Sequence, residues 1–362
     1  MKTIQAIDTI ALDVQLQQQI KDRRTSGIYY AFFDADTVLH DFAGGIADLA
    51  NRAPVSPQSV FHGYSVTKLF TATAILQLAE QGKLNLQEPV KAYLPDFAGG
   101  DGVLLRHLLT HSAGLPNPLP ISWVHRPEDD ASFDEGGFFG PIFRKNVKPG
   151  PTPNSRFVYS NLNYLLLGQV IGRVSGLTYR QYVEQHLLEP LSVGRELGFV
   201  RQKQWEVATG YHKAFSFGNL LLGFFLDKKQ YMGPATDGWK SFRPFYLNGS
   251  AYGGLIGRPA AFIAFAQDFL KPQARLLSAA SRKQMLQENR LNDGKASGMC
   301  LAWYTGTLSG QTYFCHAGGG GGYYCELRIY PEAGYGSAVF MNRSGYSDAR
   351  FLDKTDRHIF RE

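Results

Sequence analysis

Strand-like segments at both ends of the chain constrain its fold more than any other feature of the sequence. Residues 28–33 and 38–42 are rich in β-branched and aromatic side chains, and the Asp-Ala-Asp between them predicts an antiparallel hairpin. The last quarter of the chain has the same character, with further strands expected at 299–305, 312–315, 323–330 and 335–341. Because strands bury their apolar faces in a shared core, the two ends are expected to form one antiparallel sheet.

Helical periodicity dominates elsewhere. Apolar residues recur with a helical period in the segments expected to form helices, which are 3–22, 68–81, 106–110, 164–175, 179–191, 258–270 and 348–360. Residues 126–154 are first acidic and then rich in glycine and proline, which predicts a long surface loop. Residues 213–250 carry many aromatic side chains and predict an irregular insertion near the mouth of a pocket, with packing against the core as the alternative.

A chain of 362 residues is long enough for two lobes or one large domain. We expect an α/β (α+β) fold in which residues 1–85 and 250–362 form a lobe with the antiparallel sheet flanked by helices. Residues 86–249 are expected to form a mostly helical lobe with loop insertions.

Composition restricts the classes of partner. Lys and Arg outnumber Asp and Glu by 37 to 31, but the basic residues are scattered, so we expect no nucleic-acid partner. The longest apolar stretch, Leu220 to Leu226, is much shorter than the roughly 20 residues of a membrane-spanning helix. Asp8 and Asp13 interrupt the N-terminal segment, which therefore lacks the apolar core of a signal peptide, and a cytoplasmic location is expected.

Cysteine usage agrees with a reduced compartment, because the three cysteines are few and odd in number. Cys315 and Cys325 could face each other across a hairpin, although small buried hydrophobic roles are the more common use of such residues.

A Ser-x-x-Lys pair is the first feature that indicates chemistry. Ser65 and Lys68 are three residues apart at the start of a predicted helix, so their side chains lie on one face. Serine becomes a nucleophile only when a base takes its proton, and lysine can be that base if burial lowers its pKa from about 10.4. The apolar run after Lys68 predicts such burial. The alternative is an ordinary helix start, with Ser65 as the cap and Lys68 extended to water.

Two later segments could complete this site. Tyr159 and Asn161 precede an apolar helix, where the phenol could relay a proton and the amide could orient the lysine and the substrate. His316 follows a strand and precedes glycines 318–322, whose backbone permits close approach to a ligand. The alternative for Tyr159 and Asn161 is that they cap the helix. The alternative for His316 and the glycines is a mobile hairpin loop with a surface histidine.

The order Ser-x-x-Lys, Tyr-x-Asn and a strand ending in His-x-Gly resembles the serine β-lactamase and penicillin-binding-protein superfamily. The chain is most similar to the branch that contains class C β-lactamases, related D-stereospecific peptidases and β-lactamase-like carboxylesterases. Together with the motifs, further stretches of similar character extend the resemblance over roughly residues 25–345, at 104–116, 159–168, 187–191 and 253–254. The resemblance implies a β-lactamase/transpeptidase-like fold with the active site in a cleft.

The resemblance also implies roles for individual residues. Ser65 would form an acyl-enzyme, and Lys68 with Tyr159 would move protons during acylation and deacylation. The backbone amides of Ser65 and Gly319, the latter next to Gly318, would form the oxyanion hole.

His316 departs from the family pattern, which usually has lysine at this position. A lysine would offer a permanent positive charge to a substrate carboxylate, whereas a histidine is mostly neutral at pH 7. The departure favours a serine hydrolase that cleaves carboxylic esters or small amides. The alternatives are a β-lactamase, a D-alanyl-D-alanine carboxypeptidase or D-aminopeptidase, an acyltransferase of the same fold, or a non-catalytic ligand-binding member.

Other motifs carry less weight. His107 and His111 have the i, i+4 spacing of a zinc site but lack the glutamate of His-Glu-x-x-His, so packing and capping are expected instead. The segment around Ser65 lacks the last glycine of Gly-x-Ser-x-Gly, and glycines 318–322 lack the context of a dinucleotide site. We therefore expect no metal and no cofactor, and a small-molecule ester, amide or lactam as substrate. The sequence gives no oligomeric state.

Overall fold

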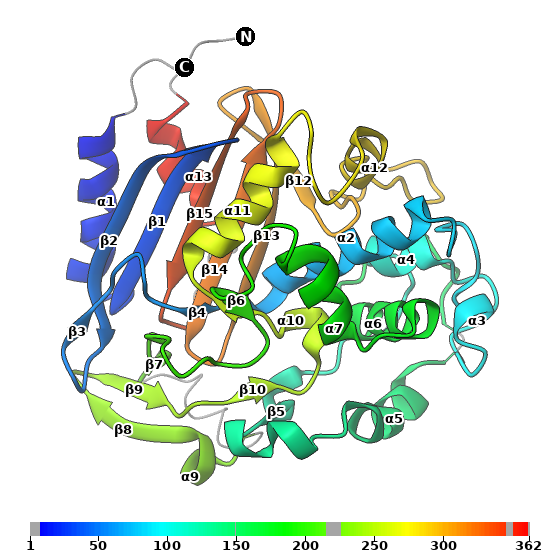
Figure 1. Cartoon of the computed structure of the whole chain (residues 1–362), viewed down its shortest axis with the longest axis horizontal. Helices are drawn as coiled ribbons and strands as arrows, with labels where there is room; N and C mark the ends of the chain where they lie inside the picture. Colours follow the sequence, from blue (N-terminus) through cyan, green and yellow to red (C-terminus); the bar gives the residue numbers. More distant parts are fainter. Residues whose placement is uncertain (1–7, 149, 215–225, 345–349, 361–362) are drawn as a thin grey trace.

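One seven-stranded antiparallel sheet organises the computed structural model, which describes residues 8–148, 150–214, 226–344 and 350–360 (Figure 1). Its order is β12-β13-β14-β15-β1-β2-β3, and its strands are β1 (Gly27–Asp34), β2 (Val38–Asp48), β3 (Ala53–Pro54), β12 (Tyr304–Leu308), β13 (Gln311–Gly320), β14 (Tyr323–Tyr330) and β15 (Tyr335–Met341). Ile28 of β1 lies opposite Met341 of β15. The predicted sheet, built from both ends of the chain, is confirmed.

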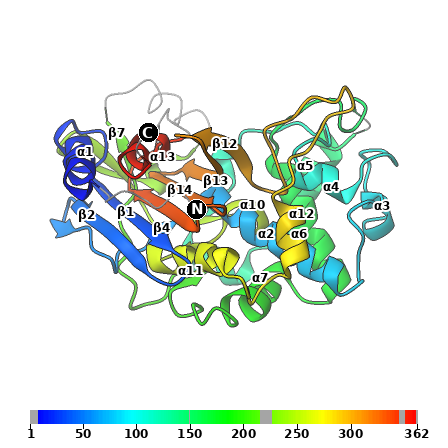
Figure 2. The same cartoon turned by 90° about the horizontal axis from the view of Figure 1, so that it is seen from above.

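The interior strand β1 is apolar on both faces because helices cover both. Alternate residues of β1 pack against helices α1 (Thr9–Lys21) and α13 (Leu352–Thr355) on one face of the sheet. The intervening residues belong to the larger core on the opposite face, which includes helix α11 (Pro259–Leu270). Figure 2 shows α1 and α13 on one side of the sheet and α11 on the other. This double burial explains the uninterrupted apolar run of β1.

The helical part centres on α2 (Thr67–Glu80) and α6 (Asn161–Ser175), which contact each other. Almost every residue of α2 is buried. The shorter helices are α3 (Val90–Tyr93), α4 (Leu105–Leu109), α5 (Glu135–Asn146), α7 (Tyr179–Val183), α9 (Lys228–Tyr231), α10 (Ser250–Gly253) and α12 (Ala279–Met285). The division into lobes at residues 85 and 250 stays a prediction. None of the helices in the described ranges has the length and apolar character of a membrane span.

Three small sheets connect the helical part to the large sheet. They pair short strands in the orders β4-β11-β6, β10-β5 and β7-β9-β8. Their bounds are β4 (Phe61–His62), β5 (Val124–His125), β6 (Leu197–Gly198), β7 (Tyr211–Lys213), β8 (Met232–Thr236), β9 (Trp239–Phe242), β10 (Tyr246–Leu247) and β11 (Ile256–Gly257). The predicted insertion at 213–250 is therefore more regular than expected, and residues 215–225 within it lie outside the described residues.

The prediction of a loop at 126–154 is wrong, because this segment contains α5. The side chain of Asp134 accepts a hydrogen bond from the backbone N–H of Gly137 and caps the helix. The aromatic side chains of α5 pack on the main core. Tertiary packing thus outweighs the low helix propensity of the glycines and of Pro141.

Two predicted elements near the C-terminus are shorter than expected. The strand predicted at 299–305 begins only at Tyr304, because the Cys300 N–H donates to the Trp303 carbonyl and Ala302 has a φ of 69°, which form a tight turn. The helix predicted at 348–360 is reduced to α13 and the 3₁₀ turn Asp356–His358, and residues 345–349 lie outside the described residues.

The three cysteines are buried and free. In the β13–β14 ladder Cys315 lies opposite Arg328, and Cys325 lies opposite Gly318. The two cysteines therefore do not face each other, and their role as small buried residues is confirmed.

The fold predicts a large loss of stability for Phe32→Ala. Phe32 is fully buried on the α1 face of the sheet and stacks on Tyr335, with ring centroids 5.3 Å apart. Its truncation is expected to lower the free energy of unfolding by about 3–5 kcal/mol, measured by urea denaturation. Val38→Ala, at an exposed position of β2, should change that energy by less than about 0.5 kcal/mol. Equal effects of the two substitutions would contradict the burial of Phe32.

Candidate active site

Ser65 lies in a 3₁₀ turn, Tyr64–Val66, that connects β4 to α2. The preceding residue, Tyr64, has a φ of 41°, in the left-handed region that side chains other than glycine rarely adopt. This sharp turn presents Ser65 to a cavity of about 430 Å³, and its side chain is only partly buried. The hydroxyl of Ser65 is therefore accessible to a small molecule.

The amine of Lys68 contacts three oxygen atoms. Its Nζ lies 3.0 Å from Ser65 Oγ, 3.0 Å from Asn161 Oδ1 and 2.8 Å from the backbone carbonyl oxygen of Tyr252. A neutral amine has two N–H donors and one lone pair. Donation to the amide oxygen of Asn161 and to the Tyr252 carbonyl leaves the lone pair directed at the hydroxyl of Ser65.

Burial determines the charge of this amine. Lys68 is fully buried, and burial lowers its pKa well below the ordinary value of 10.5. The rings of three tyrosines lie 5.1–5.5 Å from Nζ and favour the charged form weakly: Tyr159, Tyr164 and Tyr252. Among the described residues no carboxylate forms an ion pair with this amine, so desolvation dominates and favours the neutral form.

Tyr159 lies on the other side of the nucleophile. Its hydroxyl donates a hydrogen bond to Ser65 Oγ at 2.8 Å. Burial raises the pKa of Tyr159 above its ordinary value, so the side chain stays a protonated phenol. Of the two groups next to Ser65, the lysine can accept a proton and the tyrosine can donate one.

The start of α6 positions Asn161. Ser160 caps this helix by accepting a hydrogen bond from the Leu162 N–H, and the backbone N–H of Asn161 donates to Asn117 Oδ1 at 3.0 Å. The cap is therefore Ser160 rather than Tyr159 or Asn161, and the side chain of Asn161 contacts Lys68 instead. A catalytic role for this segment stays a prediction.

The glycines after His316 are required by close packing. A Cβ atom on Gly318 would lie 2.7 Å from the backbone nitrogen of Ser65 and 2.6 Å from the carbonyl oxygen of Gly63. Strand β13 thus passes directly beside the turn that carries Ser65. Gly319 follows and lines the same cavity. Ser65 and Gly319 therefore both line this cavity, and their role as an oxyanion hole stays a prediction.

The rest of the glycine run forms the tight β13–β14 turn. Gly320, Gly321 and Gly322 have φ values of 155°, 39° and 95°, which favour glycine. A Cβ atom on Gly321 would lie 2.3 Å from the Tyr64 hydroxyl and 2.4 Å from Cζ of Phe245. This turn is packed against aromatic rings, so the alternative of a mobile hairpin loop is wrong.

His316 is fully buried behind the site. Its Nδ1 lies 2.5 Å from the carbonyl oxygen of Ala302, which places the ring proton on Nδ1, and its ring centroid is 6.5 Å from that of Tyr159. Burial, with a contribution from Lys68, lowers the pKa of His316 to about 3. The position that carries lysine in the resembling family is therefore occupied by a neutral ring. Contact of His316 with a substrate stays a prediction.

The two histidines considered as zinc ligands accept hydrogen bonds from backbone N–H groups instead. His107 Nδ1 accepts the N–H of Leu104, and His111 Nδ1 accepts the N–H of Ser160. The His111 ring packs 4.3 Å from the ring of Tyr159. In the described ranges, no three His, Cys, Asp or Glu side chains are grouped to hold a metal ion.

The cavity at Ser65, called the Ser65 cavity below, is neutral and largely apolar. No described residue that lines it carries a carboxylate, ammonium or guanidinium group. Its walls combine backbone, hydroxyl, amide and apolar groups: Tyr64, Ser65, Pro120, Ile121, Val124, Asn161, His212, Leu226, Tyr231, Phe242, Phe245, Leu247, Tyr252, Gly319, Gly320, Gly321 and Ser344. The prediction that the aromatic segment 213–250 contributes to a pocket is thus confirmed for Tyr231, Phe242 and Phe245.

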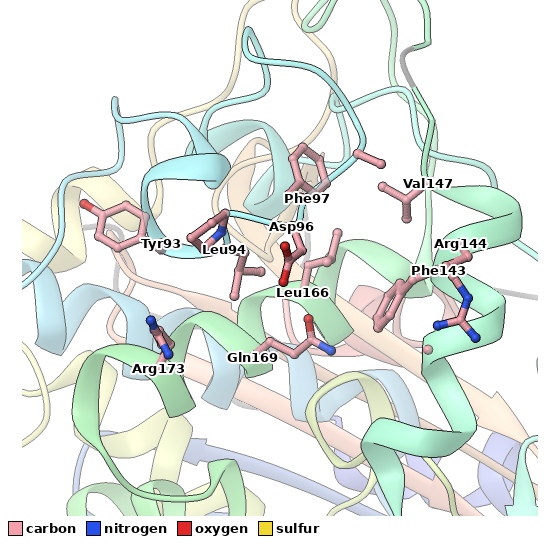
Figure 3. A pocket seen from close by; sticks show the side chains of 13 residues that line it. Tyr93, Leu94, Asp96, Phe97, Phe143, Arg144, Val147, Leu166, Gln169 and Arg173 are labelled. Atoms are coloured by element: carbon pink, nitrogen blue, oxygen red, sulfur yellow. The ribbon is translucent and has the colours of Figure 1, made fainter.

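A separate cavity of about 420 Å³ lies between the segment after α3 and the helices α5 and α6 (Figure 3). Apolar side chains such as Leu94, Phe143 and Leu166 line it, and Arg144 and Arg173 lie at its exposed edges. Its lining includes none of the predicted site residues. The two cavities have similar volumes, so volume does not distinguish them. The Ser65 cavity is the candidate active site because Ser65, with its contacts to Lys68 and Tyr159, lies at its wall.

Sequence reasoning missed two groups that complete the site. The carbonyl of Tyr252 fixes one N–H of Lys68, and a backbone carbonyl has no sequence signature. Asn117 holds the backbone of Asn161 across 44 residues of sequence, and nothing local to Asn117 indicates this contact.

Comparison with known proteins agrees with this geometry. The chain matches the Beta-lactamase family over residues 12–360. It is 29% identical over 212 residues to the putative penicillin-binding protein PbpX of Bacillus subtilis, covering 58% of this chain and 51% of that protein. It is 26% identical over 347 residues to penicillin-binding protein 4 of Amycolatopsis lactamdurans, covering 91% and 82%.

A solved structure shares the fold. The octameric penicillin-binding protein homologue from Pyrococcus abyssi superposes with a TM-score of 0.74 at 26% identity, covering 94% of this chain and 74% of that one. The chain spans about half the length of the first curated relatives it matches. The family match covers nearly the whole chain, and the chain therefore belongs to the Beta-lactamase family, within the serine β-lactamase and penicillin-binding-protein superfamily.

Proposed function

We propose that this chain is a serine hydrolase that cleaves neutral carboxylic esters or small amides through an acyl-Ser65 intermediate. One observation carries the proposal: Ser65 Oγ lies within hydrogen-bond distance of a buried lysine amine and a phenol at the wall of an accessible cavity. The proton acceptor and the proton donor thus both contact the nucleophile, which is the arrangement that covalent acyl transfer needs.

Acylation would begin with attack of Ser65 Oγ on the substrate carbonyl carbon. The hydroxyl proton moves to the lone pair of Lys68, and the carbonyl electron pair moves to its oxygen, which the amides of Ser65 and Gly319 stabilise. When the bond to the leaving group breaks, Tyr159 gives its proton to that group and receives one from the Lys68 ammonium.

Deacylation would use the same groups in reverse. A water molecule attacks the acyl carbon and gives a proton to Lys68, and the bond from Ser65 Oγ to the acyl carbon breaks. Tyr159 returns a proton to Ser65 Oγ and is reprotonated by Lys68. The cycle restores a neutral amine, a phenol and a serine hydroxyl.

The preference for neutral substrates is supported by the uncharged lining of the described Ser65 cavity. The described lining of the Ser65 cavity offers no cation to a substrate carboxylate and no carboxylate to a substrate ammonium. Because His316 stays neutral, it does not replace the missing lysine. A buried charge on the substrate would lose its hydration without compensation.

A lactam or D-alanyl peptide is the second candidate substrate class. It is supported by relatives that carry the name penicillin-binding protein. These substrates bear a carboxylate, and the described cavity does not compensate that charge, so we rank this class second.

The decisive experiment combines active-site labelling with a substrate panel. A fluorophosphonate should modify the wild-type chain at Ser65, located by mass spectrometry, and should not modify Ser65→Ala. Short p-nitrophenyl esters and neutral anilides should be hydrolysed, and Ser65→Ala should lose roughly 10⁴-fold or more in turnover. Ser155→Ala, at an exposed serine, is the matched control and should keep full activity. Faster turnover of a chromogenic cephalosporin than of any ester would reverse the ranking of substrates.

The lowered pKa of Lys68 predicts the pH dependence of labelling. The neutral amine is the base, so the labelling rate should rise with pH and reach its plateau well below pH 10.5. His316, with a pKa of about 3, should add no transition near pH 6.5. Lys68→Met should lower the rate by about 10²–10⁴-fold, whereas Lys203→Met, at an exposed position, should not. A rate that still rises above pH 10.5 would exclude a depressed lysine as the base.

His316→Lys should increase the affinity for carboxylate-bearing ligands. The carboxylate of bound benzylpenicillin would favour the charged form of this lysine, and one charge-assisted hydrogen bond would give about a 10- to 100-fold lower inhibition constant. The neutral variant His316→Gln is the matched control and should leave that constant unchanged. Fluorophosphonate labelling of each variant verifies that the site is intact. Unchanged penicillin inhibition in a labelled His316→Lys variant would show that this position does not control carboxylate binding.

A further inference from the structure

A smaller cavity, of about 230 Å³ and distinct from that of Figure 3, adjoins the Ser65 cavity. We call it the His62 cavity, and the residues that line it are Asp48, His62, Pro127, Arg201, Val207, Ala208, Thr209, Phe242, Arg243, Pro244, Phe245, Tyr246, Ile256 and Tyr323. Phe242 and Phe245 line both cavities. The two phenylalanines therefore form the partition between the two spaces.

Different contacts hold Phe242 and Phe245 in place. Phe242 ends strand β9, where its N–H donates to the carbonyl of Gly210 at 2.8 Å. Phe245 lies between β9 and β10, and its ring packs 5.2 Å from the ring of His62. On the side of the Ser65 cavity, the tip of the Phe245 ring lies against Gly321, where a Cβ atom would come within 2.4 Å of it. The Phe245 ring thus fills the passage between the β13–β14 turn and His62.

The space behind Phe245 is suited to an apolar chain. Apolar and aromatic side chains form part of its wall, including Val207, Ile256 and Tyr323. Burial lowers the pKa of His62 to about 3, so this ring is neutral at physiological pH. Arg201 and Arg243 are exposed and lie at the outer edge. A hydrocarbon chain that passed Phe245 could lie along the apolar part of this wall, with the charged groups of Asp48, Arg201 and Arg243 on the rest of the lining.

The Ser65 cavity is the acyl side of the site. It extends along Gly319 to Gly321, beyond the predicted oxyanion hole, whereas Tyr159 and His316 do not line it. Because Tyr159 is the proposed donor to the leaving group, the leaving group lies on the side of Tyr159. The acyl chain therefore extends toward Phe245.

We propose that Phe245 limits the length of the acyl chain that Ser65 accepts, by closing the Ser65 cavity against the His62 cavity. This inference rests on the proposed hydrolysis at Ser65. A neutral, unbranched acyl chain fills the Ser65 cavity until its far end meets the Phe245 ring. Truncation of that ring joins spaces of about 430 and 230 Å³ into one.

The test is a chain-length profile. The kcat/KM values of p-nitrophenyl esters with acyl chains from C2 to C12 are measured for the wild type and Phe245→Ala. Each further buried methylene contributes about fourfold in binding, so two additional methylenes should raise kcat/KM for the longer esters by about tenfold or more. The optimum chain length should increase by two or more carbons when each kcat/KM is expressed relative to that of the C2 ester for the same variant. An unchanged profile in the presence of C2 hydrolysis would overturn the inference and leave the proposed function intact.

Phe143→Ala is the matched control. Phe143 lines the cavity of Figure 3 rather than the Ser65 cavity, so its truncation should leave the length profile unchanged. A shift of the same size in this control would show a general loosening of the fold and would refute the specific role of Phe245. Thermal unfolding is measured for each variant, and Phe245→Leu, which keeps an apolar side chain, replaces Phe245→Ala if the latter does not fold.

Binding gives a readout that does not need turnover. In a Ser65→Ala background, the affinities of 1-alkanols from C4 to C12 are measured by calorimetry with and without Phe245→Ala. The affinity should stop rising at a shorter chain when Phe245 is present. If no ester or amide is cleaved, the proposed function fails, and the alkanol profile still decides whether Phe245 closes the cavity. Identical alkanol profiles would overturn the inference.

Discussion

The buried amine of Lys68 is the constraint on which the rest of the site depends. An unpaired ammonium inside the protein would be strongly destabilising, so the surrounding structure has to accommodate a neutral amine with its N–H groups satisfied. The acceptors come from α6 and α10, while Lys68 itself lies on α2. Packing among these three helices therefore does more than build a core. It determines the direction in which the amine presents its lone pair.

The large sheet contributes to the same site through a single strand. β13 passes so close to the turn of Ser65 that only glycine fits at position 318. The aromatic residues Tyr64 and Phe245 then pack on the end of the hairpin and hold it in place. In the proposed mechanism the helical part supplies the proton-transfer groups, and the sheet supplies the backbone that faces the substrate carbonyl. Ser65 lies where the two meet.

Sequence reasoning succeeded where the determinants are local. The spacing of Ser65 and Lys68 at a helix start, the burial of the helix after Lys68 and the strand at 28–33 all follow from short-range patterns. It failed where distant packing decides, as in α5, whose glycines and Pro141 predicted a loop although its aromatic side chains dock on the core. The carbonyl of Tyr252 could not be predicted for a different reason, since every residue has a carbonyl and only the fold selects one of them.

The position of β1 in the sheet has a consequence for how the chain folds during synthesis. One edge of β1 pairs with β15, and Ile28 lies opposite Met341. The β1–β15 ladder can therefore form only after residue 341 has been synthesised. At translation rates of about 5–20 residues per second, the β1–β2 hairpin exists for roughly fifteen to sixty seconds with one edge unpaired. β1 is apolar on both faces, and the unpaired backbone groups along its edge are a template for incorrect pairing. The nascent protein is therefore most vulnerable to aggregation before its last strands emerge from the ribosome.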